Sequence, residues 1–141
     1  MAITLEIAQK IIAAAHAKGH EMGFNPLTVA VLDAGGHLVA LAREDNSSTL
    51  RPDIAIGKAK GAVSMGIGSR ALGARAEQQA YFVQSINALS NGSLVPVPGG
   101  VLVKQDGKII GAVGVTGDNS DNDEIAAIAG IAAVGLEADG G

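Results

Sequence analysis

The sequence predicts an α+β fold in which an antiparallel sheet of about five strands lies between helices, as a three-layer α/β/α arrangement. Two pairs of short aliphatic runs are each joined by a glycine turn, which is typical of β-hairpins. Apolar residues near both ends of the chain recur at helical spacing. The aliphatic runs are apolar on both faces, which indicates a sheet that is covered on both sides. The predicted order is α-β-β-α-α-β-β-α, with a short fifth strand near residues 94–97.

The first predicted helix runs from Thr4 to about Met22. Its apolar residues form one stripe, and the Thr4 hydroxyl can accept a hydrogen bond from a free amide of the first turn. Gly23 and the Asn25-Pro26 pair end this helix, because a residue that precedes proline is disfavoured in the helical region. Residues 27–45 then predict the first hairpin, which turns at residues 34–36.

A second helix is predicted from Pro52 to about residue 70. Proline suits the first helical position, and Asp53 suits the positive end of the helix dipole. Small residues at positions 55, 59, 62 and 66 give this helix a smooth side for close approach to a sheet or to a partner helix. That side also supports a purely structural hypothesis, in which the chain assembles with a catabolic enzyme. A further helix is predicted from Glu77 to Leu89.

The second hairpin turns at Asp106-Gly107, a strong signal for a two-residue turn. In its second strand, glycines at positions 111, 114 and 117 recur every third residue and thin the strand where a neighbour or a ligand could lie. The last helix is predicted from Asp121 to about Leu136. Asp121 and Glu124 have the spacing of a capping box.

Composition favours a single domain over residues 1–141 and excludes several classes of function. With 141 residues, 48% of them apolar, the chain can bury one sizeable core. A net charge of −4 and an aromatic content of 2% argue against nucleic-acid binding. The lack of cysteine excludes disulfides, thiolate metal sites and thiol nucleophiles. We see no secretory signal and no apolar run of about 18 residues, so we expect a cytoplasmic protein that does not enter a membrane.

The main candidate for a ligand site is built from backbone turns. Gly99 and Gly100 follow Pro98 and allow the main chain to take positive φ, which leaves room for a close approach. Thr116, Gly117 and Asp118 follow the second hairpin and offer a hydroxyl, amides and a carboxylate. We expect these two segments to meet at one small-molecule pocket near a subunit boundary.

Arg51 is the side chain that we expect to complete this pocket. It precedes a helix start, where its guanidinium and the free amides could together hold a carboxylate. The alternative is a surface salt bridge with Asp53 or with an acidic residue of another subunit. Lys58 and Lys60 point to different sides of the same helix, and we expect both to be solvated.

Four acidic residues cluster at the start of the last helix: Asp118, Asp121, Asp123 and Glu124. Helix capping explains two or three of them, a hard cation could bind their oxygens, and a role in orienting a ligand is the third alternative. The spacing does not fit a calcium loop, and we expect no metal site. Asp118 and Glu124 are the catalytic candidates, because either carboxylate could move protons if burial raised its pKa.

Two histidines on the first predicted helix are candidate haem ligands. His16 and His20 are four residues apart, a spacing that can present two imidazoles to one metal or haem edge. They lie on the flank of the apolar stripe, so the alternative is a solvent-facing position or a subunit contact. The chain holds three aromatic residues with which to pack a porphyrin.

Three blocks of sequence resemble the GlcG/HbpS family, whose members include haem-binding proteins and the C-terminal domain of PduO-type proteins. The first block is VAVLDAGGHLVALAR and the second is GKAKGA. The third, near the end of the chain, contains PGGVLV, GKIIGAVGVTGD and DNDEIA. The resemblance spans roughly residues 5–136. It implies a profilin-like fold, homo-oligomers that include octamers, and an association with small-molecule catabolism. It also implies haem as a candidate ligand.

These observations together predict an oligomeric, small-molecule-binding protein of the GlcG/HbpS type. The alternative is an enzyme, a lyase, isomerase or hydrolase, that acts on a small carboxylic acid anchored by Arg51. The sequence shows neither a G-x-S-x-G elbow nor a glycine-rich phosphate loop that would favour nucleophilic or nucleotide chemistry.

Overall fold

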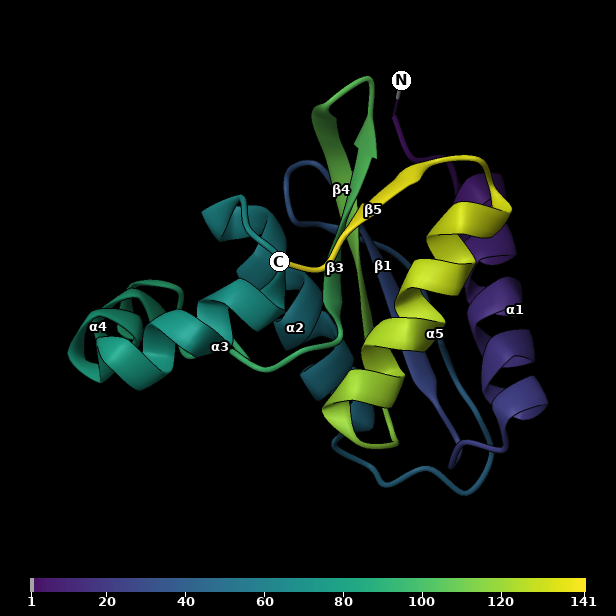
Figure 1. Cartoon of the computed structure of the whole chain (residues 1–141), viewed down its shortest axis with the longest axis horizontal. Coiled ribbons are helices and arrows are strands. Elements are labelled where there is room, and N and C mark those ends of the chain that lie inside the picture. Colours follow the sequence, from purple (N-terminus) through teal and green to yellow (C-terminus); the bar gives the residue numbers. More distant parts are fainter. Residues whose placement is uncertain (1) are drawn as a thin grey trace.

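The computed structural model describes residues 2–141 and contains one antiparallel sheet with the strand order β2-β1-β4-β3-β5 (Figure 1). Both predicted hairpins are present as β1–β2 and β3–β4, and β1 pairs with β4 to join them. The strands are β1 (Thr28–Asp33), β2 (Leu38–Arg43), β3 (Gly100–Gln105), β4 (Lys108–Thr116) and β5 (Glu137–Asp139).

The described residues form five helices. They are α1 (Leu5–Met22), α2 (Arg51–Met65), α3 (Ser69–Gln78), α4 (Ala80–Leu89) and α5 (Ser120–Ala133). Helices α1 and α5 cover one face, α2 covers the other, and α3 with α4 extends away from the sheet (Figure 1). The predicted α+β class, with an antiparallel sheet between helices, is therefore confirmed.

The hairpins and α1 form for the local reasons that the sequence predicts. Asp106 and Gly107 both have positive φ, 51° and 76°, as the tight β3–β4 turn requires. The Thr4 hydroxyl accepts from the amide of Ile7, 3.1 Å away, and caps α1. Gly23 then ends α1 in the left-handed conformation, with φ at 69°.

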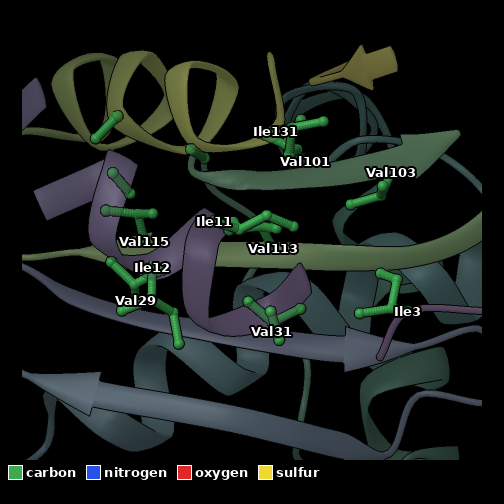
Figure 2. Close-up of a cluster of buried hydrophobic side chains, with 14 of the residues drawn as sticks. Ile3, Ile11, Ile12, Val29, Val31, Val101, Val103, Val113, Val115 and Ile131 are labelled. Carbon is green, nitrogen blue, oxygen red and sulfur yellow. The ribbon is translucent and has the colours of Figure 1, made fainter. Parts of the chain in front are cut away.

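The core has two sides because the strands are apolar on both faces. Valines of β1, β3 and β4 point toward α1 and α5, where they meet Ile11 and Ile131 (Figure 2). Leu32, Leu102 and Ala112 point the other way, toward the alanines of α2. Each fully buried Val, Leu or Ile side chain stabilises the fold by about 1.5–3 kcal/mol. The sheet is therefore held from both sides.

Helix α2 packs against the sheet through backbone contact, and glycines make this possible. A Cβ atom on Gly114 would lie 1.9 Å from the carbonyl oxygen of Ala55, and one on Gly100 would lie 2.2 Å from that of Lys58. A Cβ atom on Gly117 would lie 2.1 Å from the carbonyl oxygen of Pro26. The space beside these glycines is thus filled by the protein's own main chain. Of the two occupants that the sequence leaves open, a neighbour or a ligand, the neighbouring main chain takes this space.

Two predicted elements differ in the structure. The helix expected over residues 77–89 is the second of a pair, because α3 and α4 meet at Gln79, where no glycine or proline marks the break. Residues 94–97 do not form a strand, because the Val95 amide donates to the Gly57 carbonyl of α2 rather than to the sheet. The fifth strand is instead β5, which pairs with the outer edge of β3.

The last helix also starts and ends earlier than expected. Asn119, not Asp121, is its N-cap residue, and the Asn119 side chain accepts from the Asn122 amide at 2.9 Å. The predicted capping box is therefore wrong. The helix stops at Ala133, and Gly135 follows with a φ of 74°.

Substituting Gly114→Ala should lower the free energy of unfolding by about 3 kcal/mol, because the new methyl group has no room between β4 and α2. Gly107→Ala is the matched control, since nothing lies within 4 Å of a Cβ atom there. Its positive φ should make it lose only about 1 kcal/mol. Urea unfolding of the two variants measures both values, and equal losses would contradict the close helix–sheet contact.

Candidate functional site

A buried ion pair lies at the end of the sheet where α2 and α5 meet. Lys58 of α2 and Asp123 of α5 are 3.0 Å apart between Nζ and Oδ2, and only 2% and 1% of each residue is exposed. The Lys58 ammonium also donates to the carbonyl oxygen of Val115 at 3.0 Å. The expectation that Lys58 would be solvated was wrong.

Burial and pairing act in opposite directions on this pair. Burial lowers the pKa of Lys58, and the nearby Arg51 guanidinium adds to that effect, whereas the Asp123 carboxylate opposes it. Burial likewise raises the pKa of Asp123, and the Lys58 charge opposes that shift. Asp123 also accepts from the Asp118 amide at 2.9 Å through its second oxygen. Each charge therefore depends on its partner to remain ionised in a dry environment.

Gly99 and Gly100 enclose Lys58. A Cβ atom on Gly99 would lie 2.9 Å from the Lys58 Nζ, and the φ of Gly99 is 120°. The Gly100 amide donates to the hydroxyl of Ser69 at 2.7 Å, which fastens the start of α3 to β3. Pro98 instead lines a different surface hollow, beside Arg70. Pro98 thus lines a surface hollow, whereas Lys58 fills the space beside Gly99 and Gly100.

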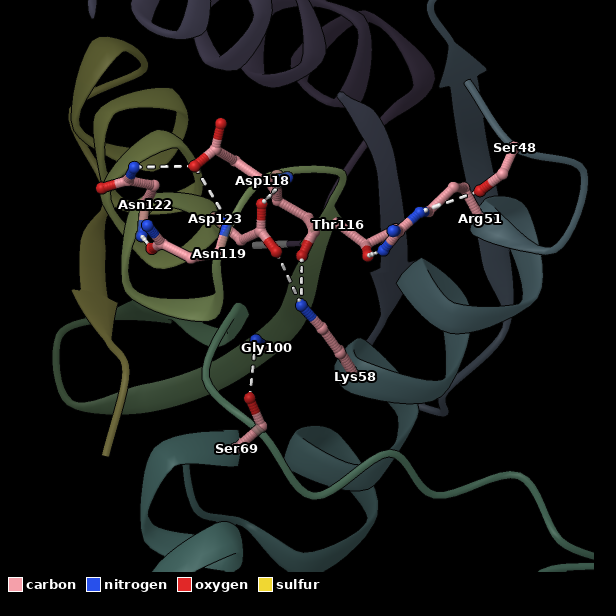
Figure 3. Close-up of polar contacts among 11 residues, drawn as sticks. Ser48, Arg51, Lys58, Ser69, Gly100, Thr116, Asp118, Asn119, Asn122 and Asp123 are labelled. Atoms are coloured by element: carbon pink, nitrogen blue, oxygen red, sulfur yellow. Dashed lines mark hydrogen bonds and ion pairs between the residues drawn. The ribbon is translucent and has the colours of Figure 1, made fainter. Parts of the chain in front are cut away.

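Arg51 and Thr116 are brought together as the sequence suggests. The Arg51 Nη1 atom donates to the Thr116 hydroxyl at 2.7 Å, and its Nε atom donates to the Ser48 hydroxyl at 3.1 Å (Figure 3). Arg51 is half-buried. Among residues 2–141 it forms no salt bridge with Asp53 or with another carboxylate, so the salt-bridge alternative within one chain was wrong.

The acidic cluster divides among different roles. Asp118 accepts from the amides of Asn25 and Asn119 and from the Asn122 side chain, each at 2.8 Å. The Asn25 amide is the largest cause of a lowered pKa at Asp118, followed by the Asn122 side chain, so this carboxylate is held ionised. Glu124, 3.1 Å from the Nε atom of Arg70, belongs to a separate surface ion pair that also includes Asp121.

A hollow of about 520 Å³ lies beside the C-terminal half of α1 and contains both candidate haem ligands. His16 is half-buried, and its Nε2 atom lies 3.2 Å from the carbonyl oxygen of Leu27. The His20 Nε2 atom contacts the Glu44 carboxylate, which also accepts from the Leu27 amide at 2.7 Å. The full lining comprises His16, His20, Phe24, Pro26, Arg43, Glu44 and Asp45.

The hydrogen bonds assign the same tautomer to both imidazoles. A carbonyl oxygen accepts only, so the neutral His16 ring carries its proton on Nε2. Burial alone would raise the pKa of Glu44, but its bonds from the Leu27 amide and the His20 ring lower the pKa overall, so Glu44 is an ionised acceptor. His20 therefore donates from Nε2 as well. In the neutral form of each ring, the lone pair is therefore on Nδ1.

Sequence reasoning found the two histidines and Arg51 but missed Lys58, Asp123 and the hollow's Glu44. The helical spacing of Ala55, Ala59 and Ala62 already places Lys58 on the same side of α2, and all four residues are buried. That periodicity was the available signal for a buried lysine. Nothing local marks Glu44, because its partners come from α1 and from the start of β1.

Comparison with known proteins places these features in a family. The fold and site define a small α+β protein with an open antiparallel sheet, a buried lysine–aspartate pair and a histidine-lined hollow. The model of the family described as "Haem degrading protein HbpS-like" matches residues 3–132. Protein GlcG of Escherichia coli K12 is 35% identical over 117 residues, which cover 80% of each chain. The chain therefore belongs to the HbpS-like family, as its resemblance to GlcG/HbpS proteins predicted.

Solved structures agree with this assignment. A double mutant of HbpS from Streptomyces reticuli has a TM-score of 0.79 and 30% identity, covering 94% of this chain and 86% of that one. The crystal structure of a PduOC:heme complex has a TM-score of 0.87 over 97% of this chain and 98% of that one. At 23% identity, this second likeness shows the fold alone. No helix within residues 2–141 is long and apolar enough to cross a membrane.

Substituting Lys58→Met should lower the free energy of unfolding by about 3–5 kcal/mol, because it leaves the Asp123 carboxylate buried without a partner. Asp123→Asn should cause a similar loss by stranding the ammonium. The double variant should lose clearly less than the sum of the two, as denaturant unfolding can measure. Lys104→Met is the control, since the partly exposed Lys104–Asp139 pair should contribute less than about 1 kcal/mol. Strictly additive losses would contradict a coupled pair.

Proposed function

We propose that this chain is a small-molecule-binding protein and that haem is the ligand its histidine-lined hollow suits best. The observation that carries this proposal is the anchoring of two imidazoles at one hollow through their Nε2 atoms. A metal-ligating histidine usually donates its other ring N–H to a carboxylate or a carbonyl, which fixes the ring and makes it a better ligand. His16 and His20 each have such an acceptor in place.

The remaining lining fits the other parts of a haem group. Phe24 and Pro26 supply apolar surface for the porphyrin, and Arg43 supplies a cation for a propionate carboxylate. Leu27 and Glu44 hold the two imidazoles in their orientations. When bound, haem supplies an iron centre capable of one-electron chemistry. The description of the matching family, as haem-degrading and HbpS-like, supports this choice of ligand.

The proposal also takes the protein to be cytoplasmic, homo-oligomeric and associated with small-molecule catabolism. Helix α4 supports self-assembly, because it carries no charged residue and extends from the sheet with little covering. Tyr81 is 68% exposed and Leu89 is 84% exposed on this helix. An apolar surface without charge can meet a second copy of a chain whose net charge is −4 without like-charge repulsion.

The alternative, an enzyme that acts on a small carboxylic acid, has support for its anchoring step. Arg51 is half-buried and lacks a carboxylate partner within residues 2–141. Its proton-moving step has less support, because Asp118 is held ionised and Glu124 is paired with Arg70. We therefore propose binding rather than catalysis.

Adding hemin to the purified protein should give a saturable shift of the Soret band at about one hemin per chain. His16→Ala or His20→Ala should weaken binding by about 10–100-fold, whichever ring is the iron ligand. Titration by absorbance gives the dissociation constants.

His37→Ala is the matched control for this titration. His37 lies just before β2, beside Asp33, and does not line the hollow. Its loss should leave hemin binding unchanged. A wild-type spectrum that does not saturate, or equal weakening in all three variants, would contradict haem binding at this hollow.

Native mass spectrometry should show a homo-oligomer, and an octamer is one of the expected assemblies. The double variant Tyr81→Ser/Leu89→Ser should shift the population toward smaller assemblies, since it removes apolar surface from α4. A wild-type protein that is monomeric at micromolar concentration would contradict self-assembly.

A further inference from the structure

We propose that Arg51, Thr116 and Thr28 form a subsite for the carboxylate group of a small organic acid. This subsite lies on the α2 side of the sheet, whereas the histidine-lined hollow lies beside α1. It does not depend on haem binding. The inference rests on an excess of hydrogen-bond donors and positive charge over acceptors at this end of the sheet.

The guanidinium of Arg51 is only partly used by the protein. A guanidinium has five N–H donors, and the described residues accept two of them, at Thr116 and Ser48. Both acceptors are neutral hydroxyl groups. The positive charge therefore has no counter-ion in residues 2–141, although Arg51 is half-buried.

Each hydroxyl group beside Arg51 has an O–H that is free to donate. Thr116 accepts from Arg51, so its own O–H remains free to donate. Thr28 is fully buried, and its hydroxyl has no hydrogen-bond partner within the described residues. Buried polar groups almost always have partners, so this hydroxyl needs an explanation.

The sheet register places the two threonines together. Thr28 of β1 is directly opposite Thr116 of β4, so both side chains stand on the same face, within about 4.5–5.5 Å between Cβ atoms. This is the face that α2 covers, because Ala112 and Leu32 of the same strands contact the alanines of α2. The unpartnered hydroxyl of Thr28 is thus held beside the threonine that Arg51 contacts.

Neighbouring acids do not neutralise this group. Asp123 is 3.0 Å from Lys58, and the Asp118 oxygens accept from three asparagines. Asp53 is exposed on the first turn of α2 and makes no ion pair with Arg51. Lys58 lies close enough for the Arg51 charge to lower its pKa, but the Lys58 charge itself is balanced by Asp123.

A carboxylate is the anion that this geometry suits best. Two N–H groups of a planar guanidinium match the two oxygens of a carboxylate, and a threonine hydroxyl can donate to either oxygen. Arg51 is half-buried, so part of its side chain remains open to solvent. Acetate is therefore an adequate probe of the subsite, and inorganic phosphate is the comparison for a general anion site.

The test is an NMR titration of ¹⁵N-labelled protein with sodium acetate at constant ionic strength. Acetate should shift the Arg51 side-chain Nε–H signal and the Thr28 and Thr116 amides saturably, whereas chloride should not. Arg51→Met should weaken acetate binding at least tenfold. Lys60→Met, which removes a cation from the same helix, should leave it unchanged. If Arg51→Met does not fold, Arg51→Lys can be measured instead. It keeps the positive charge but lacks the paired N–H groups of the guanidinium, so it should also weaken acetate binding about tenfold.

Thr28→Val separates a role of the Thr28 hydroxyl in binding acetate from a role in stabilising the fold. It removes the unpartnered hydroxyl at nearly constant volume, so the free protein should be at least as stable as the wild type, while acetate binding should weaken several-fold. The proposal would be overturned if acetate caused no saturable shift, or if phosphate and chloride caused shifts equal to those of acetate. It would also be overturned if Arg51→Met and Arg51→Lys bound acetate as well as the wild type. None of these outcomes bears on the hemin titration.

Discussion

The buried contact between Lys58 of α2 and Asp123 of α5 is the interaction on which this end of the molecule depends. The two residues approach from helices on opposite faces of the sheet and meet beyond the end of β4 (Figure 3). Their charges can leave water only together, because burial favours the neutral form of each. The main chain must also leave room for the Lys58 side chain, and Gly99 does so because it has no Cβ atom beside the ammonium. The ion pair and the glycines around it therefore form one structural unit.

Both candidate sites are arranged around this unit. Asp123 holds the Asp118 amide, and Asp118 in turn holds the amide of Asn25 at the entry to β1. On one side of that entry, Pro26 lines the hollow that contains His16 and His20. On the other side, Thr28 faces α2 and Arg51. The same short segment thus separates a hollow suited to haem from a group of donors suited to a carboxylate.

Much of the fold could be predicted from the sequence because its signals are local. The Asp106-Gly107 turn, the Thr4 cap and the periodicity of α1 each involve residues a few positions apart, and the structure confirms them. The Lys58–Asp123 contact joins residues 65 positions apart, and no local pattern identifies a partner at that distance. For the same reason, the sequence could not decide whether the glycines of β4 admit a neighbouring element or a ligand, and the structure places the main chain of α2 beside Gly114. The α3–α4 break was missed because no glycine or proline marks it, and β5 was missed because it is only three residues long and follows closely on the last helix.

The most direct test of this account is an NMR measurement of the Lys58 ammonium in protein labelled with ¹⁵N-lysine at neutral pH. A buried ammonium that donates to Asp123 and Val115 is shielded from water. It should give a slowly exchanging Nζ signal that is absent from the Lys58→Met variant and displaced in Asp123→Asn. Rapid exchange of every lysine ammonium with water, as in a free amino acid, would contradict the buried pair and the arrangement of both candidate sites around it.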